Sequence, residues 1–200
     1  MALTTGRRIA GAAVAFAALA VLATRTVRQG CLTRADQAAF DRVRARRTSP
    51  GIALAHAVSA LAEPEVIYPL LAVTSVVAMR RADWRHAAMP GLVIGGAIAR
   101  RMLSRLIGRP RPPAEAWLTT PEGYSLPSKH TTLAALGAGA FVRTLDVQGS
   151  PARAAPMLAA AGVGVSRVYL GVHWPTDVVA GWLFAEGWLL LTAPARPAAA

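Results

Sequence analysis

An uncharged run, IAGAAVAFAALAVLAT, fills residues 9–24 and is bounded by arginine on both sides. Arg7 and Arg8 precede the run, and Arg25 follows it directly. The run is long for the apolar segment of a signal peptide, and arginine stands where a cleavage site would need small residues. We therefore predict an uncleaved first transmembrane helix over about residues 8–24.

Similar apolar stretches recur along the chain. Of its 200 residues 54% are hydrophobic, whereas ordinary globular domains have about 45–50%. The excess lies in stretches rich in Ala, Val, Leu and Gly that arginines separate, a pattern typical of repeated membrane crossing. Glu63 and Pro64 interrupt one stretch, so we predict a kink there after a half-helix over residues 50–62. Further membrane helices are predicted over residues 66–80, 86–107, 128–145, 153–171 and 175–193.

The predicted fold class is all-α, a polytopic membrane helical bundle of about six transmembrane helices. Residues 25–49 are more polar, and Leu32, Phe40 and Val43 recur among their charges at helical spacing. This pattern predicts an amphipathic helix that lies on the membrane surface. The predicted organisation is residues 1–49 for the first two helices, 50–193 for the core bundle and 194–200 for a disordered tail.

The net charge of +12 limits the classes of partner. A basic chain suits nucleic acid, anionic lipid or phosphorylated substrates. Nucleic acid is disfavoured because the sequence has neither zinc-ligand spacing nor a basic amphipathic recognition helix. Arginines beside apolar segments are typical of contacts with lipid headgroups. Cys31 is the single cysteine, which excludes an intrachain disulfide and a metal site built from cysteines.

Polar residues gather at the ends of predicted membrane helices. With antiparallel neighbours, the end of the third helix, the start of the fourth, the end of the fifth and the start of the sixth share one face of the membrane. A charged side chain at bilayer depth costs about 2.5–3.5 kcal/mol, so it usually faces a partner or a water-filled site. The residues that meet there are Arg111, Ser128, Lys129, His130, Arg167, His173 and Asp177.

These residue types suit phosphoryl transfer. Arginine matches phosphate with two parallel hydrogen bonds, which favours Arg111 and Arg167 as phosphate ligands. Ser128 and Lys129 follow a proline at a predicted helix start, where free N–H groups and the helix dipole favour an anion. The sequence therefore predicts Ser128, Lys129 and the two arginines as substrate-binding residues.

Two imidazoles and a carboxylate could supply the chemistry. His173 and Asp177 are spaced i, i+4 and lie on one helical face, so the carboxylate can orient the imidazole as a nucleophile. His130 can protonate the leaving group and then activate water. A metal site is disfavoured because the pair lacks a third ligand, and no cofactor is predicted. A single histidine at an interface is more often a hydrogen-bonded structural residue.

Three short motifs resemble the signatures of the phosphatidic acid phosphatase type 2 superfamily. Arg111-Pro112 resembles the end of the first, Lys-x6-Arg-Pro. The second, usually Pro-Ser-Gly-His, is matched by Pro127-Ser128-Lys129-His130. The third is matched by Ser166-Arg167-x5-His173-x3-Asp177. All three occur in order across about residues 50–193, and a chance match of the third alone is rare.

The resemblance implies a bundle of membrane helices that removes phosphate from lipids without a metal. It implies His173 as nucleophile, Asp177 as its partner and His130 as acid and base. Ser104 stands where the first signature has lysine, and either Arg101 or Arg105 could supply that charge. Lys129 replaces the usual glycine of the second signature, which puts the substrate in doubt more than the reaction.

The predicted function is hydrolysis of a phosphomonoester or pyrophosphate on a lipid-linked substrate through a phosphohistidine. Candidate lipids are polyprenyl phosphates, phosphorylated polyprenyl sugars, phosphatidic acid and phosphatidylglycerol phosphate. The same superfamily includes soluble haloperoxidases that use vanadate, and the apolar stretches disfavour that activity for this chain. An inactive relative that binds anionic lipid or a membrane partner is the alternative, and a transporter is disfavoured because the charges lie at one end of the helices.

The predicted partners are the membrane and the lipid-linked substrate, while the oligomeric state stays open. The resemblance implies a bacterial-type plasma membrane with the site on the extracytoplasmic face. Residues 25–49 carry seven arginines and would lie on the same side. The positive-inside rule favours the opposite orientation.

Overall fold

The computed structural model describes residues 4–27, 31–145 and 150–194, and its regular elements there are all helices. The predicted all-α bundle is confirmed, and the predicted tail lies outside the described residues except for Pro194. In chain order the elements are α1 (Thr5–Val27), α2 (Cys31–Ala45), α3 (Ser49–Ala60), α4 (Pro64–Arg80), α5 (Trp84–Ala87), α6 (Met89–Ile107), the 3-10 turn η1 (Ala114–Ala116), α7 (Lys129–Thr144), α8 (Ser150–Tyr169) and α9 (Pro175–Thr192).

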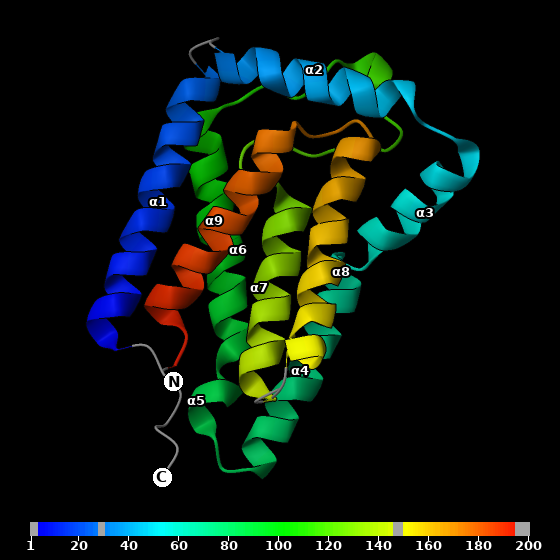
Figure 1. The fold of residues 1–200 in the computed structure, drawn as a ribbon. Helices are drawn as coiled ribbons and strands as arrows, with labels where there is room; N and C mark the ends of the chain where they lie inside the picture. Colours follow the sequence, from blue (N-terminus) through cyan, green and yellow to red (C-terminus); the bar gives the residue numbers. More distant parts are fainter. Residues whose placement is uncertain (1–3, 28–30, 146–149, 195–200) are drawn as a thin grey trace.

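Helix α7 lies at the centre of the bundle, with α4, α6, α8 and α9 packed around it (Figure 1). Its sequence, KHTTLAALGAGAFVRT, is rich in small residues, and almost all of them are buried. A methyl group at Gly139 would overlap Leu189 of α9, so the glycine permits the close approach of these two helices. Helix α1 packs along the outer side of α9. Because α7 is central, its first residues lie close to the ends of the neighbouring helices.

Helix α2 lies crosswise over one end of the bundle (Figure 1). Its buried residues are Asp36 and Phe40, which are one turn apart and face the protein. The Phe40 ring lies 5.3 Å from the ring of Trp174, which precedes α9. This helix was predicted, and its buried side covers the loops that connect the bundle helices.

Prolines divide two of the apolar stretches into pairs of helices. Helices α3 and α4 meet at an angle of 42°, and Pro64 is the first residue of α4, as the predicted kink requires. The predicted helix over residues 86–107 is instead the short α5 followed by α6. Pro90 lies in the first turn of α6, and because it lacks an N–H group the helical hydrogen bonds cannot continue through it.

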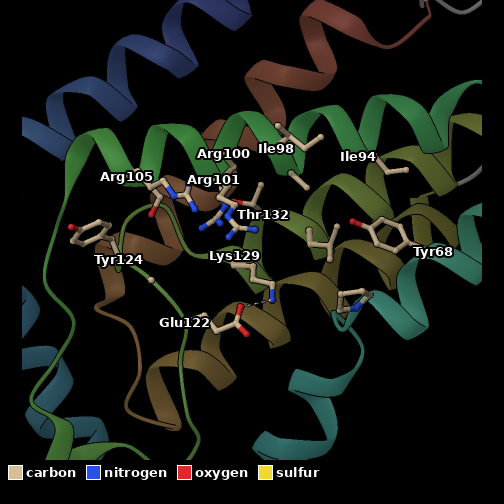
Figure 2. A pocket seen from close by; sticks show the side chains of 15 residues that line it. Tyr68, Ile94, Ile98, Arg100, Arg101, Arg105, Glu122, Tyr124, Lys129 and Thr132 are labelled. Atoms are coloured by element: carbon tan, nitrogen blue, oxygen red, sulfur yellow. Dashed lines mark ion pairs between the residues drawn. The ribbon is translucent and has the colours of Figure 1, made fainter.

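The predicted number of membrane helices is not confirmed by length and composition alone. Among the described residues, α1 is the one helix long and apolar enough to cross a membrane, and the bent α3–α4 pair qualifies only if it counts as one span. Helix α7 has 16 residues, and α6 carries three arginines near its end. Those arginines, together with Lys129 of α7, face a pocket beside α6 (Figure 2).

Candidate active site

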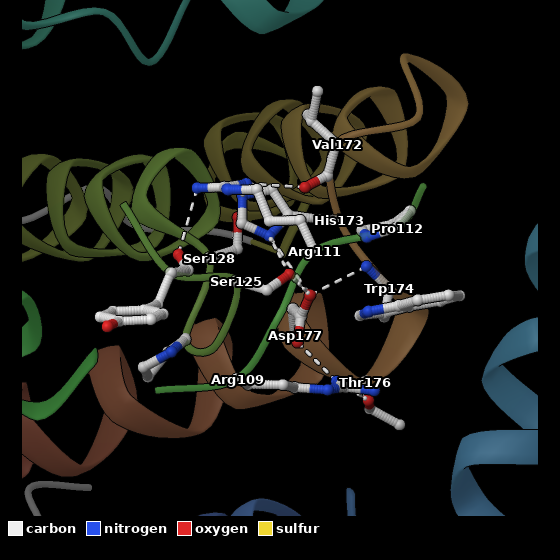
Figure 3. A network of polar contacts seen from close by, with 12 residues as sticks. Arg109, Arg111, Pro112, Ser125, Ser128, Val172, His173, Trp174, Thr176 and Asp177 are labelled. Carbon is white, nitrogen blue, oxygen red and sulfur yellow. Dashed lines mark hydrogen bonds and ion pairs between the residues drawn. The ribbon is translucent and has the colours of Figure 1, made fainter. Parts of the chain in front are cut away.

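The end of the bundle beneath α2 brings His173 and Asp177 together (Figure 3). His173 lies in the loop after α8, and Asp177 lies in the first turn of α9. The His173 Nδ1 atom is 3.3 Å from Asp177 Oδ2, and both side chains are fully buried. The backbone N–H of Trp174 donates to the same carboxylate oxygen at 2.8 Å. Asp177 therefore caps the start of α9 and also orients the imidazole.

Arg109 and Ser125 hold the other sides of the Asp177 carboxylate. Arg109 Nη1 donates to Asp177 Oδ1 at 2.5 Å, and the Ser125 hydroxyl donates to Oδ2. Arg109 Nη2 also donates to Asp36 of α2 at 2.6 Å. Asp36 in turn accepts the backbone N–H of Thr176 at 2.9 Å. A buried network thus links α2, the Arg109 loop and the start of α9. Figure 3 shows the part of it around Arg109 and Asp177.

The far nitrogen of His173 faces Arg111. Arg111 Nη1 lies 3.1 Å from His173 Nε2, which accepts this contact if the imidazole proton is on Nδ1, beside Asp177. Backbone carbonyls of Val172, Glu122 and others fix the guanidinium in place. Burial lowers the pKa of His173 to about 4, although the hydrogen bond to Asp177 opposes this shift. The imidazole is therefore neutral at ordinary pH, with the Nε2 lone pair directed toward the arginine.

His173 lines a cavity with a volume of about 180 Å³, and the imidazole of His130 lines the same cavity. His130 Nε2 lies 3.0 Å from Glu63 Oε1, a carboxylate at the break between α3 and α4. Burial acts to raise the pKa of Glu63, but the contact with His130 and the charges of Lys129 and Arg167 together outweigh it and leave the pKa lowered. The charged and titratable residues that line the cavity are Glu63, Arg111, Glu122, Lys129, His130, Arg167 and His173.

Two further cations complete the cavity. Arg167, in the last turn of α8, is buried and donates from Nη1 to Ser59 Oγ at 2.6 Å. Its Nε has no hydrogen-bond partner among the described residues, so it can still donate to an anion. Lys129 Nζ is 3.7 Å from Glu122, a largely exposed carboxylate. An anion in this space would meet three positively charged side chains, because Arg111 also lines it.

Five of the predicted site residues line this cavity: Arg111, Lys129, His130, Arg167 and His173. Asp177 lies behind His173, and Ser128 does not line the cavity. The Ser128 hydroxyl accepts hydrogen bonds from the backbone and side chain of Thr131 and caps α7. Its backbone N–H donates to the Asp177 carbonyl at 3.1 Å. The role of Ser128 as a phosphate ligand therefore stays a prediction, while its observed contacts join α7 to α9.

Sequence reasoning missed Asp36, Glu63 and Ser125 as parts of the site and gave Arg109 no role. The sequence does indicate a special position for Asp36, because this residue stands one turn after Leu32 and one turn before Phe40 on the apolar face of an amphipathic helix. Glu63 and Ser125 had no comparable signal. Across the described residues, no three His, Cys, Asp or Glu side chains gather in a way that could hold a metal.

Comparison with known proteins relates the chain to lipid phosphatases. A family model described as the PAP2 superfamily matches residues 85–199. The decaprenylphosphoryl-5-phosphoribose phosphatase of Mycobacterium tuberculosis is 36% identical over 141 residues, which cover 66% of this chain and 73% of that protein. An undecaprenyl-diphosphatase of Sulfolobus acidocaldarius is 41% identical over 70 residues, covering 33% of this chain. The chain spans only 31% of the length of the Sulfolobus protein.

A solved structure shares the fold. The first transmembrane PAP2 type phosphatidylglycerolphosphate phosphatase from Bacillus subtilis superposes with a TM-score of 0.81 at 24% sequence identity. The superposition covers 90% of this chain and 93% of the other. The superposed share of the chain is larger than residues 85–199, the region that the family model matches.

Proposed function

This chain belongs to the PAP2 superfamily, and we propose that it is an integral membrane phosphatase that dephosphorylates a lipid-linked substrate through a phosphohistidine. One observation carries the proposal. The neutral His173 is held by Asp177 at Nδ1 and presents Nε2 to a cavity that also contains His130, Arg111 and Arg167. A protein that only bound anionic lipid would need the cations but no oriented imidazole.

In the first step, the Nε2 lone pair of His173 attacks the phosphorus atom and the bond from phosphorus to the leaving oxygen breaks. Arg111, Lys129 and Arg167 bind the phosphoryl oxygens, where charge is held in the transition state. Protonated His130 gives its proton to the leaving oxygen. Asp177 stabilises the positive charge that forms on His173, and Arg109 and Ser125 keep that carboxylate in position.

In the second step, water attacks the phosphohistidine and the phosphorus–nitrogen bond breaks. His130, now neutral, accepts the proton of the attacking water and returns to its starting form. Glu63 lies 3.0 Å from His130 Nε2 and stabilises the protonated imidazole before the first step and after the second. Inorganic phosphate then leaves the cavity, and His173 is again neutral.

The test of this function is phosphate release from a panel of lipid phosphates by detergent-purified protein in EDTA. The panel holds a polyprenyl phosphate, a polyprenyl diphosphate, phosphatidic acid and phosphatidylglycerol phosphate. We expect release from at least one lipid at the same rate with and without EDTA, because the described side chains supply the nucleophile and the charge. Intact, folded protein that releases phosphate from none of them would favour the inactive, lipid-binding relative.

We also propose that the site faces the extracytoplasmic side of a bacterial-type plasma membrane. The site lies under α2, at the end of the bundle opposite the start of α1 (Figure 1). A cytoplasmic N-terminus therefore places the site outside. The positive-inside rule opposes this orientation because of the arginines around α2. The rule describes loops, so it applies less directly to Arg34, Arg42 and Arg44, which lie on α2, a helix packed on the protein.

Cys31 can report this orientation, because it is the one cysteine and is exposed at the start of α2. We expect a membrane-impermeant maleimide to label the protein in intact cells, and a Cys31→Ser variant to remain unlabelled. Labelling that requires permeabilised cells would place the site in the cytoplasm. A membrane-permeant maleimide controls for access to the thiol in both states.

A further inference from the structure

A second and larger pocket adjoins the cavity at His173. Its volume is about 350 Å³, and it lies between α4, α6 and the start of α7 (Figure 2). Lys129 and Glu122 line both spaces, so the two are neighbours on either side of that ion pair. The larger pocket therefore extends from the cavity at His173 toward the outer surface of the bundle.

Positive charge dominates one end of the pocket. Arg100, Arg101 and Arg105 all line it, and their side chains lie near Lys129 (Figure 2). Glu122 is the one carboxylate among the lining residues in the described part of the chain, and it already pairs with Lys129. Arg100 donates to the Pro127 carbonyl at 3.1 Å, whereas Arg101 and Arg105 are exposed, so their charges are available to a ligand that carries negative charge.

Ser104 adds an independent sign of a ligand. Its side chain lines the same pocket and is 4% exposed, yet its hydroxyl has no hydrogen-bond partner among the described residues. A buried hydroxyl without a partner costs about 1–3 kcal/mol. An oxygen atom of a bound anion would satisfy it.

The other wall of the pocket is apolar. Ile94 and Ile98 of α6 and Leu133 of α7 line it, with Tyr68 of α4 (Figure 2). Both isoleucines are exposed on the outside of the bundle, at 44% and 57%. An apolar chain could therefore lie along this wall and continue into the bilayer, while a charged group stays among the arginines.

We propose that the larger pocket binds a second phosphate group of the substrate, located between the scissile phosphate and the lipid chain. This inference rests on the proposed function, since it assigns the substrate class of the same site. Arg101, Arg105 and Ser104 line only the larger pocket, so they bind a different group from the phosphate that His173 attacks. The substrate is thus a lipid that carries two phosphate groups, either as a diphosphate or as a phosphodiester followed by a terminal phosphate.

The test measures lipid binding to a His173→Ala protein, which cannot turn the ligand over. Two matched pairs are compared in detergent: phosphatidic acid with phosphatidylglycerol phosphate, and a prenyl phosphate with the corresponding diphosphate. We expect at least one two-phosphate lipid to bind about 10-fold more tightly than its partner, because hydrogen bonds to charged groups are strong. The pair with the larger ratio distinguishes a separated second phosphate from an adjacent one.

Adding Arg101→Gln or Arg105→Gln should reduce that preference about 10-fold, and Arg101→Lys should retain most of it. Arg80→Gln, an exposed arginine at the far end of α4, is the matched control and should leave the preference intact. Thermal unfolding of each variant shows whether it is folded.

Equal binding of both members of each pair, or a preference that survives Arg101→Gln with Arg105→Gln, would overturn the inference. Wild-type protein that hydrolyses no lipid would remove the proposed function instead, and the binding ratio would still decide whether a two-phosphate site exists.

Discussion

A His173→Ala variant should release phosphate more than about 10⁴-fold more slowly than the wild type, as expected when a covalent nucleophile is removed. His173 Nε2 is the atom that faces the cavity, and Asp177 holds the opposite ring nitrogen at 3.3 Å. Burial keeps the pKa of this residue at about 4, so the attacking form is present throughout the usual assay range. Initial rates with the best lipid of the panel measure the loss.

Trapping of the intermediate separates this role from a structural one. Wild-type protein quenched during turnover of a ³²P-labelled lipid should carry label that is stable in base and lost in acid, as a phosphorus–nitrogen bond requires. His173→Ala should carry none. His56→Ala, an exposed histidine of α3, is the matched control and should label normally. Label that persists in folded His173→Ala protein would assign the nucleophile to another residue.

The part of the site that could be predicted depends on short-range spacing and on helix connectivity. The i, i+4 interval that brings His173 and Asp177 together is fixed once α9 is a helix. Alternating helix directions place His130 and Arg167 at the same end of the bundle as that pair. Both relations follow from the positions of helices, which apolar stretches mark clearly in this chain.

The supporting residues could not be predicted because they depend on how loops and helices dock. Glu63 meets His130 only because α3 and α4 diverge by 42° at Pro64, which leaves the carboxylate at a break in the helix. Ser125 reaches Asp177 from an irregular loop, where no periodicity applies. The sequence marks Arg101 and Arg105 of the larger pocket only as substitutes for a lysine, because it does not indicate how many pockets the helix ends enclose.

The second large effect is expected on stability, at Arg109. Its side chain is buried between Asp36 of α2 and Asp177 of α9, at 2.6 and 2.5 Å. Arg109→Leu leaves two buried carboxylates without a cation, and the expected cost is about 3–5 kcal/mol in the free energy of unfolding. Thermal unfolding in detergent measures the shift, and Arg42→Leu, an exposed arginine of α2, is the matched control.

A double variant shows where this cost arises. Adding Asp36→Leu to Arg109→Leu removes one of the stranded carboxylates, so the double variant should be less destabilised than the sum of the two single variants. Phosphate release should still be low in the double variant, because Asp177 has lost the guanidinium that fixes its orientation beside His173. If the shift in unfolding temperature of the double variant equals the sum of the shifts of the two single variants, α2 is not energetically linked to the nucleophile. The observed contacts favour coupling, since one guanidinium bridges the helix that covers the site and the carboxylate that orients the nucleophile.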